Sequence, residues 1–229
     1  ALTGALLCLC AARLAAQEAA PRGSAAWTGE PVVRTRSGAV RGFPDADVTW
    51  VWKAIPFARP PVGELRWRAP QNPIPWAGIR SERSFNAGCT QYRLFNSNAI
   101  RGSEDCLYLN VWRPRDSETG LPVYVFIHGG GNEMGSATQL SDYHGNRLAS
   151  RSRLVFVSLN YRLGPFGWFT HPALRHGQPD LDASGNYGLL DMIKALEWIR
   201  DNIEAFGGDP QRVTVTGHSS GGMDVLALL

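Results

Sequence analysis

The sequence predicts an α/β fold with a mostly parallel central sheet flanked by helices. Two continuous apolar runs bounded by turn residues, 123–127 and 154–159, are typical of strands that a parallel sheet buries on both faces. An apolar period of about 3.6 residues over 188–206, ended by Gly207-Gly208, predicts an amphipathic helix. A short strand at 213–216 and a helical run from Met223 continue the alternation.

Further strands are predicted nearer the start of the chain. Residues 31–43 predict an N-terminal β-hairpin that turns at Ser37-Gly38. Residues 47–57 are rich in strand-forming side chains, 56–73 form a loop punctuated by proline, and 107–112 predict another strand. No repeat or linker interrupts the chain after Trp27, so residues 27–229 are expected to belong to one domain.

The first 25 residues resemble the remains of a secretory signal peptide. Residues 1–12 are apolar, and small residues suited to cleavage follow at 14–16 and 24–26. The apolar stretch is too short to span a bilayer. Neither Met nor a basic segment precedes it, so we expect a partial signal peptide at 1–25 and a secreted or periplasmic protein. A buried or frayed Ala-rich helix and lipidation at Cys8 are the alternatives.

The cysteine pattern agrees with export. Cys8 and Cys10 fall in the expected signal, which leaves Cys89 and Cys106. In an exported protein one remaining pair most simply forms a disulfide, which would stabilise the fold by about 3 kcal/mol. Two free buried thiols are the alternative.

Composition and charge exclude several classes of function. The chain has 229 residues, 44% of them hydrophobic, with eight Trp, which is enough for a sizeable core. The net charge of +3 comes from scattered Arg, so no basic face for nucleic acid is expected. The five His lack metal-ligand spacing, and no phosphate-binding glycine motif with Lys occurs, so neither a metal nor a cofactor is expected.

Gly217-His218-Ser219-Ser220-Gly221 is a G-x-S-x-G pattern placed between a predicted strand and a predicted helix. A tight strand-to-helix turn lifts the serine hydroxyl above the sheet, and glycines at both ends relieve the crowding of the turn. Ser219 is therefore the candidate nucleophile.

A second glycine motif, His128-Gly129-Gly130-Gly131, follows the strand at 123–127. Such glycines leave backbone N–H groups free to bind a developing oxyanion together with the N–H of Ser220. Each donor of this kind is worth about 3–4 kcal/mol to the transition state. Taken alone, the motif could equally be a flexible turn.

Together these motifs and others in the same order resemble the type-B carboxylesterase/cholinesterase family of α/β-hydrolases, from about Val32 to the end of the chain. The other motifs that carry the resemblance are AIPFA at 54–58, PPVG at 60–63 with Arg66, SEDCLYLN at 103–110, NYRLG at 160–164, GNYGLLD at 185–191 and FGGDP at 206–210. The resemblance implies the N-terminal part of an α/β-hydrolase domain.

The resemblance also implies hydrolysis of a small-molecule carboxylic ester through an acyl-enzyme, with Ser219 as nucleophile. It implies three oxyanion donors, a Cys89–Cys106 disulfide and a buried structural ion pair; the donors are Gly130, Gly131 and Ser220, and the pair is Arg66–Glu104. In this family the acid and the His of the triad follow the serine, so we expect them beyond Leu229 and expect these 229 residues alone to be inactive. Non-catalytic adhesion or scaffold relatives are the alternative, although such proteins typically lose the serine.

Departures from the family pattern bear on the substrate. His218 stands where most relatives have Glu, and no Trp lies between Cys89 and Cys106, so the charge attraction and cation–π contact that bind choline both lose their usual residues. Tyr92 or Phe95 could supply only a weaker aromatic platform. Asn132 stands where an aromatic residue often follows the glycines, which predicts a differently shaped acyl pocket.

None of the five His is expected to replace the missing base. His218 neighbours Ser219 on a turn where side chains splay apart, and His128 is expected to support the oxyanion loop. The others are expected at the solvated surface: His144, His171 and His176.

Overall fold

The computed structural model describes residues 27–93 and 96–229. The expected signal peptide at 1–25, with Cys8 and Cys10, and the candidate platform Phe95 lie outside these residues. The strands are β1 Val32–Thr35, β2 Gly38–Arg41, β3 Phe43–Asp45, β4 Thr49–Pro56, β5 Ile79–Arg80, β6 Gln91–Arg93, β7 Asn96–Arg101, β8 Tyr108–Pro114, β9 Leu121–Ile127, β10 Val155–Leu159 and β11 Gly208–Gly217. The helices are α1 Asn146–Ser152, α2 Gly164–Gly167, α3 Pro172–Arg175, α4 Asp180–Ala183, α5 Tyr187–Asn202 and α6 Ser220–Ala227, with 3₁₀ turns at Gly63–Leu65, Ser141–Tyr143 and Ile203–Phe206.

The central sheet has six strands in the order β11-β9-β10-β8-β4-β3, and the α/β class is confirmed. Its direction is mixed rather than mostly parallel. The β11–β9 and β9–β10 pairs are parallel, whereas the β10–β8, β8–β4 and β4–β3 pairs are antiparallel. The short turn between β3 and β4 permits only an antiparallel pair, and apolar periodicity carries no information on strand direction.

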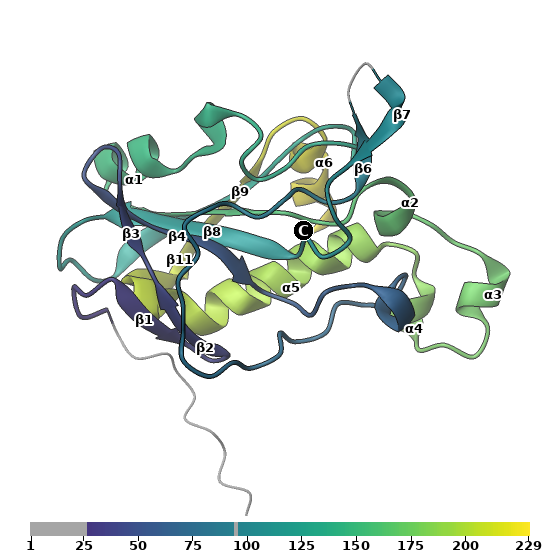
Figure 1. Cartoon of the computed structure of the whole chain (residues 1–229), viewed down its shortest axis with the longest axis horizontal. Coiled ribbons are helices and arrows are strands. Elements are labelled where there is room, and N and C mark those ends of the chain that lie inside the picture. Colours follow the sequence, from purple (N-terminus) through teal and green to yellow (C-terminus); the bar gives the residue numbers. More distant parts are fainter. Residues whose placement is uncertain (1–26, 94–95) are drawn as a thin grey trace, which may run out of the picture.

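Helices cover both faces of this sheet, with α5 on one side and α1 on the other (Figure 1). Successive strand residues point to opposite faces, so Val111 of β8 packs in the core that contains α5 while Trp112 packs against α1. All five residues of β10 are buried, as expected for a strand covered on both faces. In β9 buried positions alternate with half-buried ones, so that strand is fully covered on one face only.

Two local predictions shift by a small amount. The hairpin forms between β1 and β2, but its turn residues are Arg36-Ser37, because Gly38 already pairs with Thr35. The Thr35 hydroxyl accepts the N–H groups of Ser37 and Gly38 and so stabilises the turn without a glycine at its tip.

The buried face of α5 includes Met192 and Ile199, as the apolar period predicts, with one exception and three additions. Ile193 is 42% exposed, while Tyr187, Asp191 and Trp198 are buried. The helix continues into the 3₁₀ turn and ends at Gly207, whose φ of 76° is typical of a helix C-terminus. Asp191 is buried on this face together with Arg162, with which it forms an ion pair.

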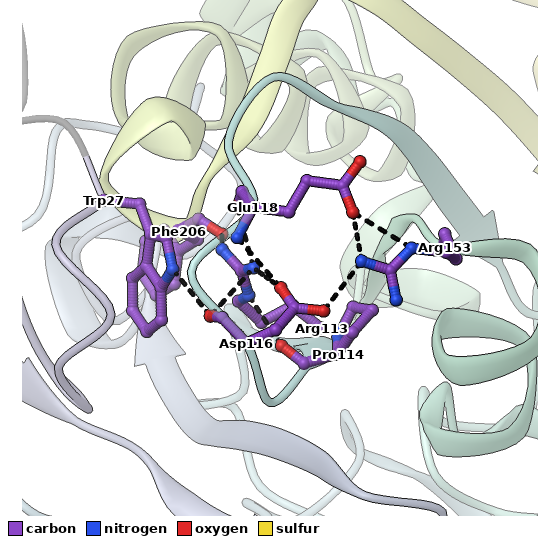
Figure 2. Close-up of polar contacts among 7 residues, drawn as sticks. All are labelled: Trp27, Arg113, Pro114, Asp116, Glu118, Arg153 and Phe206. Atoms are coloured by element: carbon purple, nitrogen blue, oxygen red, sulfur yellow. Dashed lines mark hydrogen bonds and ion pairs between the residues drawn. The ribbon is translucent and has the colours of Figure 1, made fainter.

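A buried arginine connects the turn between β8 and β9 to the end of the 3₁₀ turn Ile203–Phe206 (Figure 2). Arg113 is fully buried, and its guanidinium donates to the carbonyl oxygens of Pro114, Phe206 and Glu118 at 2.8–3.0 Å. It also bonds Asp116 Oδ1 at 2.8 Å and stacks over the ring of Trp27. Arg113 could not be predicted as such a residue, because W-R-P within a strand carries no sign of these partners.

In the described part of the chain, no helix has the length and apolar character needed to cross a membrane.

Candidate active site

Ser219 lies on a sharp turn between β11 and α6. Its backbone has φ 54° and ψ −121°, a strained conformation for a residue with a side chain, and its side chain is exposed. A Cβ added to Gly217 would lie 2.1 Å from the carbonyl carbon of Gly221, so the two ends of the motif approach too closely for any other residue. The G-x-S-x-G pattern therefore adopts the turn geometry that the sequence predicts for a nucleophile.

Parallel pairing of β9 and β11 brings the two glycine motifs together. Ile127 pairs with Gly217 at the carboxyl ends of the strands, so the next residues of both chains emerge at the same edge. The N–H of His218 donates to the carbonyl of Ile127 at 3.0 Å. A Cβ on Gly129 would lie 2.4 Å from the carbonyl oxygen of His218, which shows how closely the loop approaches the turn. Sequence-distant motifs thus form one site at the switch point of the sheet.

Three backbone N–H groups at this edge are free to bind an anion. Within residues 27–93 and 96–229, no acceptor takes the N–H of Gly130, Gly131 or Ser220. Gly130 has φ 124°, and a Cβ there would lie 2.0 Å from the carbonyl oxygen of Met134. Ser220 is the first residue of α6, so its N–H belongs to the positive end of that helix. These are the three N–H groups that the family resemblance implies as oxyanion donors.

The side chain of Asn132 is held within this loop. Its Oδ1 accepts from the Tyr161 hydroxyl at 3.2 Å and its Nδ2 donates to Asp224 Oδ1 at 3.0 Å. Its backbone N–H donates to the hydroxyl of Ser220 at 3.3 Å. The side chain of Ser220 therefore contacts the oxyanion loop, in addition to the candidate donor role of its backbone N–H. Both polar atoms of the Asn132 side chain are therefore engaged with protein groups.

His128 is buried at the start of the oxyanion loop and packs against Tyr161. It is 1% exposed, its ring stacks on Tyr161 with 4.5 Å between centroids, and its Nδ1 lies 2.9 Å from the carbonyl oxygen of Gly129. Because a carbonyl can only accept, Nδ1 carries the proton. Burial lowers the pKa of His128 to about 4, so the ring is neutral.

No base contacts the Ser219 hydroxyl in the described part of the chain. The hydrogen bond that His218 makes goes to another group, because its Nδ1 lies 3.1 Å from the Tyr143 hydroxyl. His144 is half-buried, and its ring packs against those of Phe85 and Trp112. His171 and His176 are exposed, with His171 accepting the N–H of Ala173 at the start of α3.

Beside the site, Cys89 and Cys106 are joined by a disulfide. Arg66 and Glu104 form a two-point ion pair, with Nε–Oε2 at 2.6 Å and Nη2–Oε1 at 2.7 Å. This pair is not buried as expected, since the two side chains are 38% and 25% exposed. Tyr92, the weaker aromatic platform, is 61% exposed.

The buried ion pair of the domain is a different one. Arg162 and Asp191, which are 3% and 0% exposed, bond at two points. Arg162 is the middle residue of the NYRLG motif and Asp191 is the last residue of the GNYGLLD motif, so the only sequence signal for this pair was one charged residue in each motif.

Across residues 27–93 and 96–229, no three side chains of His, Cys, Asp or Glu gather as metal ligands would.

Comparisons with known proteins identify the family of this chain. The model of the carboxylesterase family matches residues 29–229. A fumonisin B1 esterase of Sphingopyxis macrogoltabida is 48% identical over 202 residues, which cover 86% of this chain and 36% of that protein. A para-nitrobenzyl esterase of Bacillus subtilis is 42% identical over 86% of this chain and 40% of its own, and acetylcholinesterase of Gallus gallus is 42% identical over 85% and 27%.

The solved structure of a PNB esterase superposes with a TM-score of 0.78 at 42% identity, covering 88% of this chain and 40% of that one. The α/β-hydrolase fold is thereby confirmed. The chain spans two fifths or less of the length of these relatives. Since the family model matches nearly all of the described residues, the chain belongs to the carboxylesterase family.

Proposed function

We propose that the complete protein hydrolyses small-molecule carboxylic esters with Ser219 as nucleophile. The observation that carries the proposal is the exposed Ser219 on its strained turn, beside the unpaired N–H groups of Gly130, Gly131 and Ser220. A non-catalytic adhesion or scaffold role would require neither the serine nor this set of donors.

In the proposed reaction the Ser219 Oγ attacks the ester carbonyl carbon and transfers its proton to a base. The carbonyl oxygen becomes an oxyanion that the three N–H groups stabilise, and each donor contributes about 3–4 kcal/mol. Collapse of this intermediate expels the alcohol, which takes the proton, and leaves an acyl-enzyme. Water then attacks the acyl carbon by the same route and releases the acid.

We propose that the base is a His outside these 229 residues, oriented by an acid that precedes it in the chain. Support comes from the geometry of His218 and His128, since the first bonds Tyr143 and the second is buried and neutral. The short span of this chain relative to its relatives also supports the proposal.

The proposed substrates are neutral or acidic esters rather than choline esters. His218 adjoins the serine and is hydrogen-bonded to Tyr143, and neither side chain carries the negative charge that would attract a quaternary ammonium. The names of the relatives include both non-choline and choline ester hydrolases, so the charges beside the serine support this proposal rather than the names. We further propose export by a signal peptide, a hypothesis supported by the apolar start of the sequence and by the Cys89–Cys106 disulfide.

The test uses the protein expressed from its complete coding sequence. We expect hydrolysis of p-nitrophenyl butyrate and covalent labelling by a fluorophosphonate probe, and both should vanish in Ser219→Ala. Ser81→Ala, which changes an exposed loop serine, is the matched control and should keep both. A wild-type protein that is folded, unlabelled and inactive would favour the adhesion alternative.

A further inference from the structure

Asp224 is a buried carboxyl group on α6, close to the candidate site but outside the proposed reaction. It is 6% exposed. Its Oδ1 accepts from Asn132 Nδ2 at 3.0 Å, and its Oδ2 is buried without a hydrogen-bond donor among the described residues. Burial raises the pKa of Asp224, an effect that the Asn132 amide opposes. A carboxyl group is costly to bury in this way, so its position calls for a role.

The group that Asp224 contacts is the last residue of the oxyanion loop. Asn132 directly follows Gly131 and has φ 58°, a left-handed conformation that a side-chain bond can stabilise. Its backbone N–H bonds Ser220 Oγ, and its backbone carbonyl accepts the N–H of Gly164 at 2.7 Å. With its side chain bonded to Asp224 and Tyr161, all four polar groups of Asn132 have partners.

These bonds join the loop to both of its neighbours. Tyr161 contacts the loop at two places, because the single hydrogen of its hydroxyl is shared between the carbonyl of His128 at 2.8 Å and Asn132 Oδ1 at 3.2 Å. Asp224 lies on the helix that begins directly after Ser219. The Asn132 side chain is thus held on one side by Tyr161 and on the other side by Asp224 of α6.

We infer that Asp224 is a positioning residue for ester hydrolysis, which holds Gly130 and Gly131 against the nucleophile turn by fixing Asn132. The inference rests on the proposed function. Without the Asp224 contact, Asn132 loses one of two side-chain anchors, and the N–H groups of the preceding glycines lose their fixed direction. The oxyanion forms only in the transition state, so kcat should fall while KM changes little.

The first experiment compares Asp224→Ala with Asp224→Asn in the protein expressed from its complete coding sequence. For p-nitrophenyl butyrate, Asp224→Ala should lower kcat by about 10- to 100-fold and change KM by less than about 3-fold. Asp224→Asn keeps an oxygen that can accept from Asn132 and should stay within about 5-fold of wild type. Glu204→Ala, which removes an exposed carboxylate on the 3₁₀ turn, is the control and should match wild type.

A second readout separates positioning from general loss of structure. A thiono ester places sulfur, a weak hydrogen-bond acceptor, where the oxyanion forms, so it gains less from the N–H donors than the oxo ester does. Asp224→Ala should therefore lower the oxo/thiono rate ratio. An equal fall for both esters, or no fall in either, would overturn the inference.

Asn132→Ala breaks the same contact from the loop side. If Asp224→Ala fails to fold, a normal oxo/thiono ratio in folded Asn132→Ala would overturn the inference by itself. If both fold, the double variant should lose no more kcat than the worse single variant, because both act through one contact. Wild-type protein without esterase activity or probe labelling would instead refute the proposed function, so the two failures are distinguishable.

Discussion

Arg162 and Asp191 meet at two points, with Nε to Oδ2 at 2.8 Å and Nη2 to Oδ1 at 2.7 Å, where neither side chain is more than 3% exposed. The same carboxylate accepts the backbone N–H of Arg162 at 3.0 Å. This contact joins the segment after β10 to α5 and thereby positions Tyr161, the residue that supports the oxyanion loop.

Asp191→Ala should destabilise the fold strongly, because it leaves the guanidinium of Arg162 buried without its counter-charge. The expected loss in free energy of unfolding is about 3–5 kcal/mol. Urea denaturation followed by tryptophan fluorescence measures it. Asp180→Ala, an exposed aspartate on α4, is the control; equal midpoints for the two variants would contradict the prediction.

Arg113 and Arg153 bind the two oxygens of the same carboxylate, Asp116, yet should contribute very differently (Figure 2). Arg113→Ala removes a fully buried side chain and leaves three backbone carbonyls without donors, so we expect a loss of about 3–5 kcal/mol. Arg153 is 54% exposed, and solvent screens its pairs with Asp116 and Glu118. Arg153→Ala should therefore barely move the thermal unfolding midpoint. A larger shift of the thermal unfolding midpoint for Arg153→Ala than for Arg113→Ala would contradict the prediction.

Reduction of the Cys89–Cys106 disulfide should lower stability by about 3 kcal/mol, since the bridge closes a loop with a sequence separation of 17. The measurement is the urea midpoint with and without dithiothreitol. The double variant Cys89→Ala/Cys106→Ala should start at the lower midpoint and show no response to the reductant. An unchanged wild-type midpoint under reducing conditions would count against this contribution.

His128 should make the fold less stable as the pH falls from about 6.5 to 4. Its pKa is about 4 when folded, whereas an unfolded His titrates near 6.5, so the unfolded state binds more protons between these values. The resulting loss is about 2 kcal/mol at pH 5 relative to pH 8. In His128→Gln the difference between unfolding free energies at pH 8 and pH 5 should shrink by that amount. His176→Gln, at an exposed position, should keep the wild-type difference.

His218→Glu should shift the substrate preference toward cationic esters. A carboxylate beside Ser219 would attract a quaternary ammonium, and such a pair near a surface is worth on the order of 1–4 kcal/mol. We expect kcat/KM for butyrylcholine to rise by roughly 10-fold relative to that for p-nitrophenyl butyrate. His218→Gln removes the imidazole without adding charge and should leave the ratio near wild type. If this ratio of kcat/KM values is unchanged in His218→Glu, residue 218 does not determine the preference for substrate charge.

Much of the site was predictable because its signals are local. The turn at Ser219 and the loop at Gly130 and Gly131 depend on short glycine patterns next to apolar strands, and the structure places them together at the ends of β9 and β11. Sequence patterns do not show which distant residues a side chain contacts, and the predictions were weakest there. The exposure of the Arg66–Glu104 pair and the packing of His144 depend on chain segments far away in sequence.

The sequence by itself determined the α/β class, the strand–helix–strand–turn–helix order over residues 154–229, the candidate nucleophile and its oxyanion loop, because each follows from periodicity or from backbone crowding within a few residues. Only the tertiary structure decided the direction of each strand pair, the burial of Arg162 with Asp191, and the contact of Asn132 with Asp224. Those features join residues far apart in the chain. They depend on the register in which strands pair and on which helix face turns inward, and no short sequence pattern encodes either.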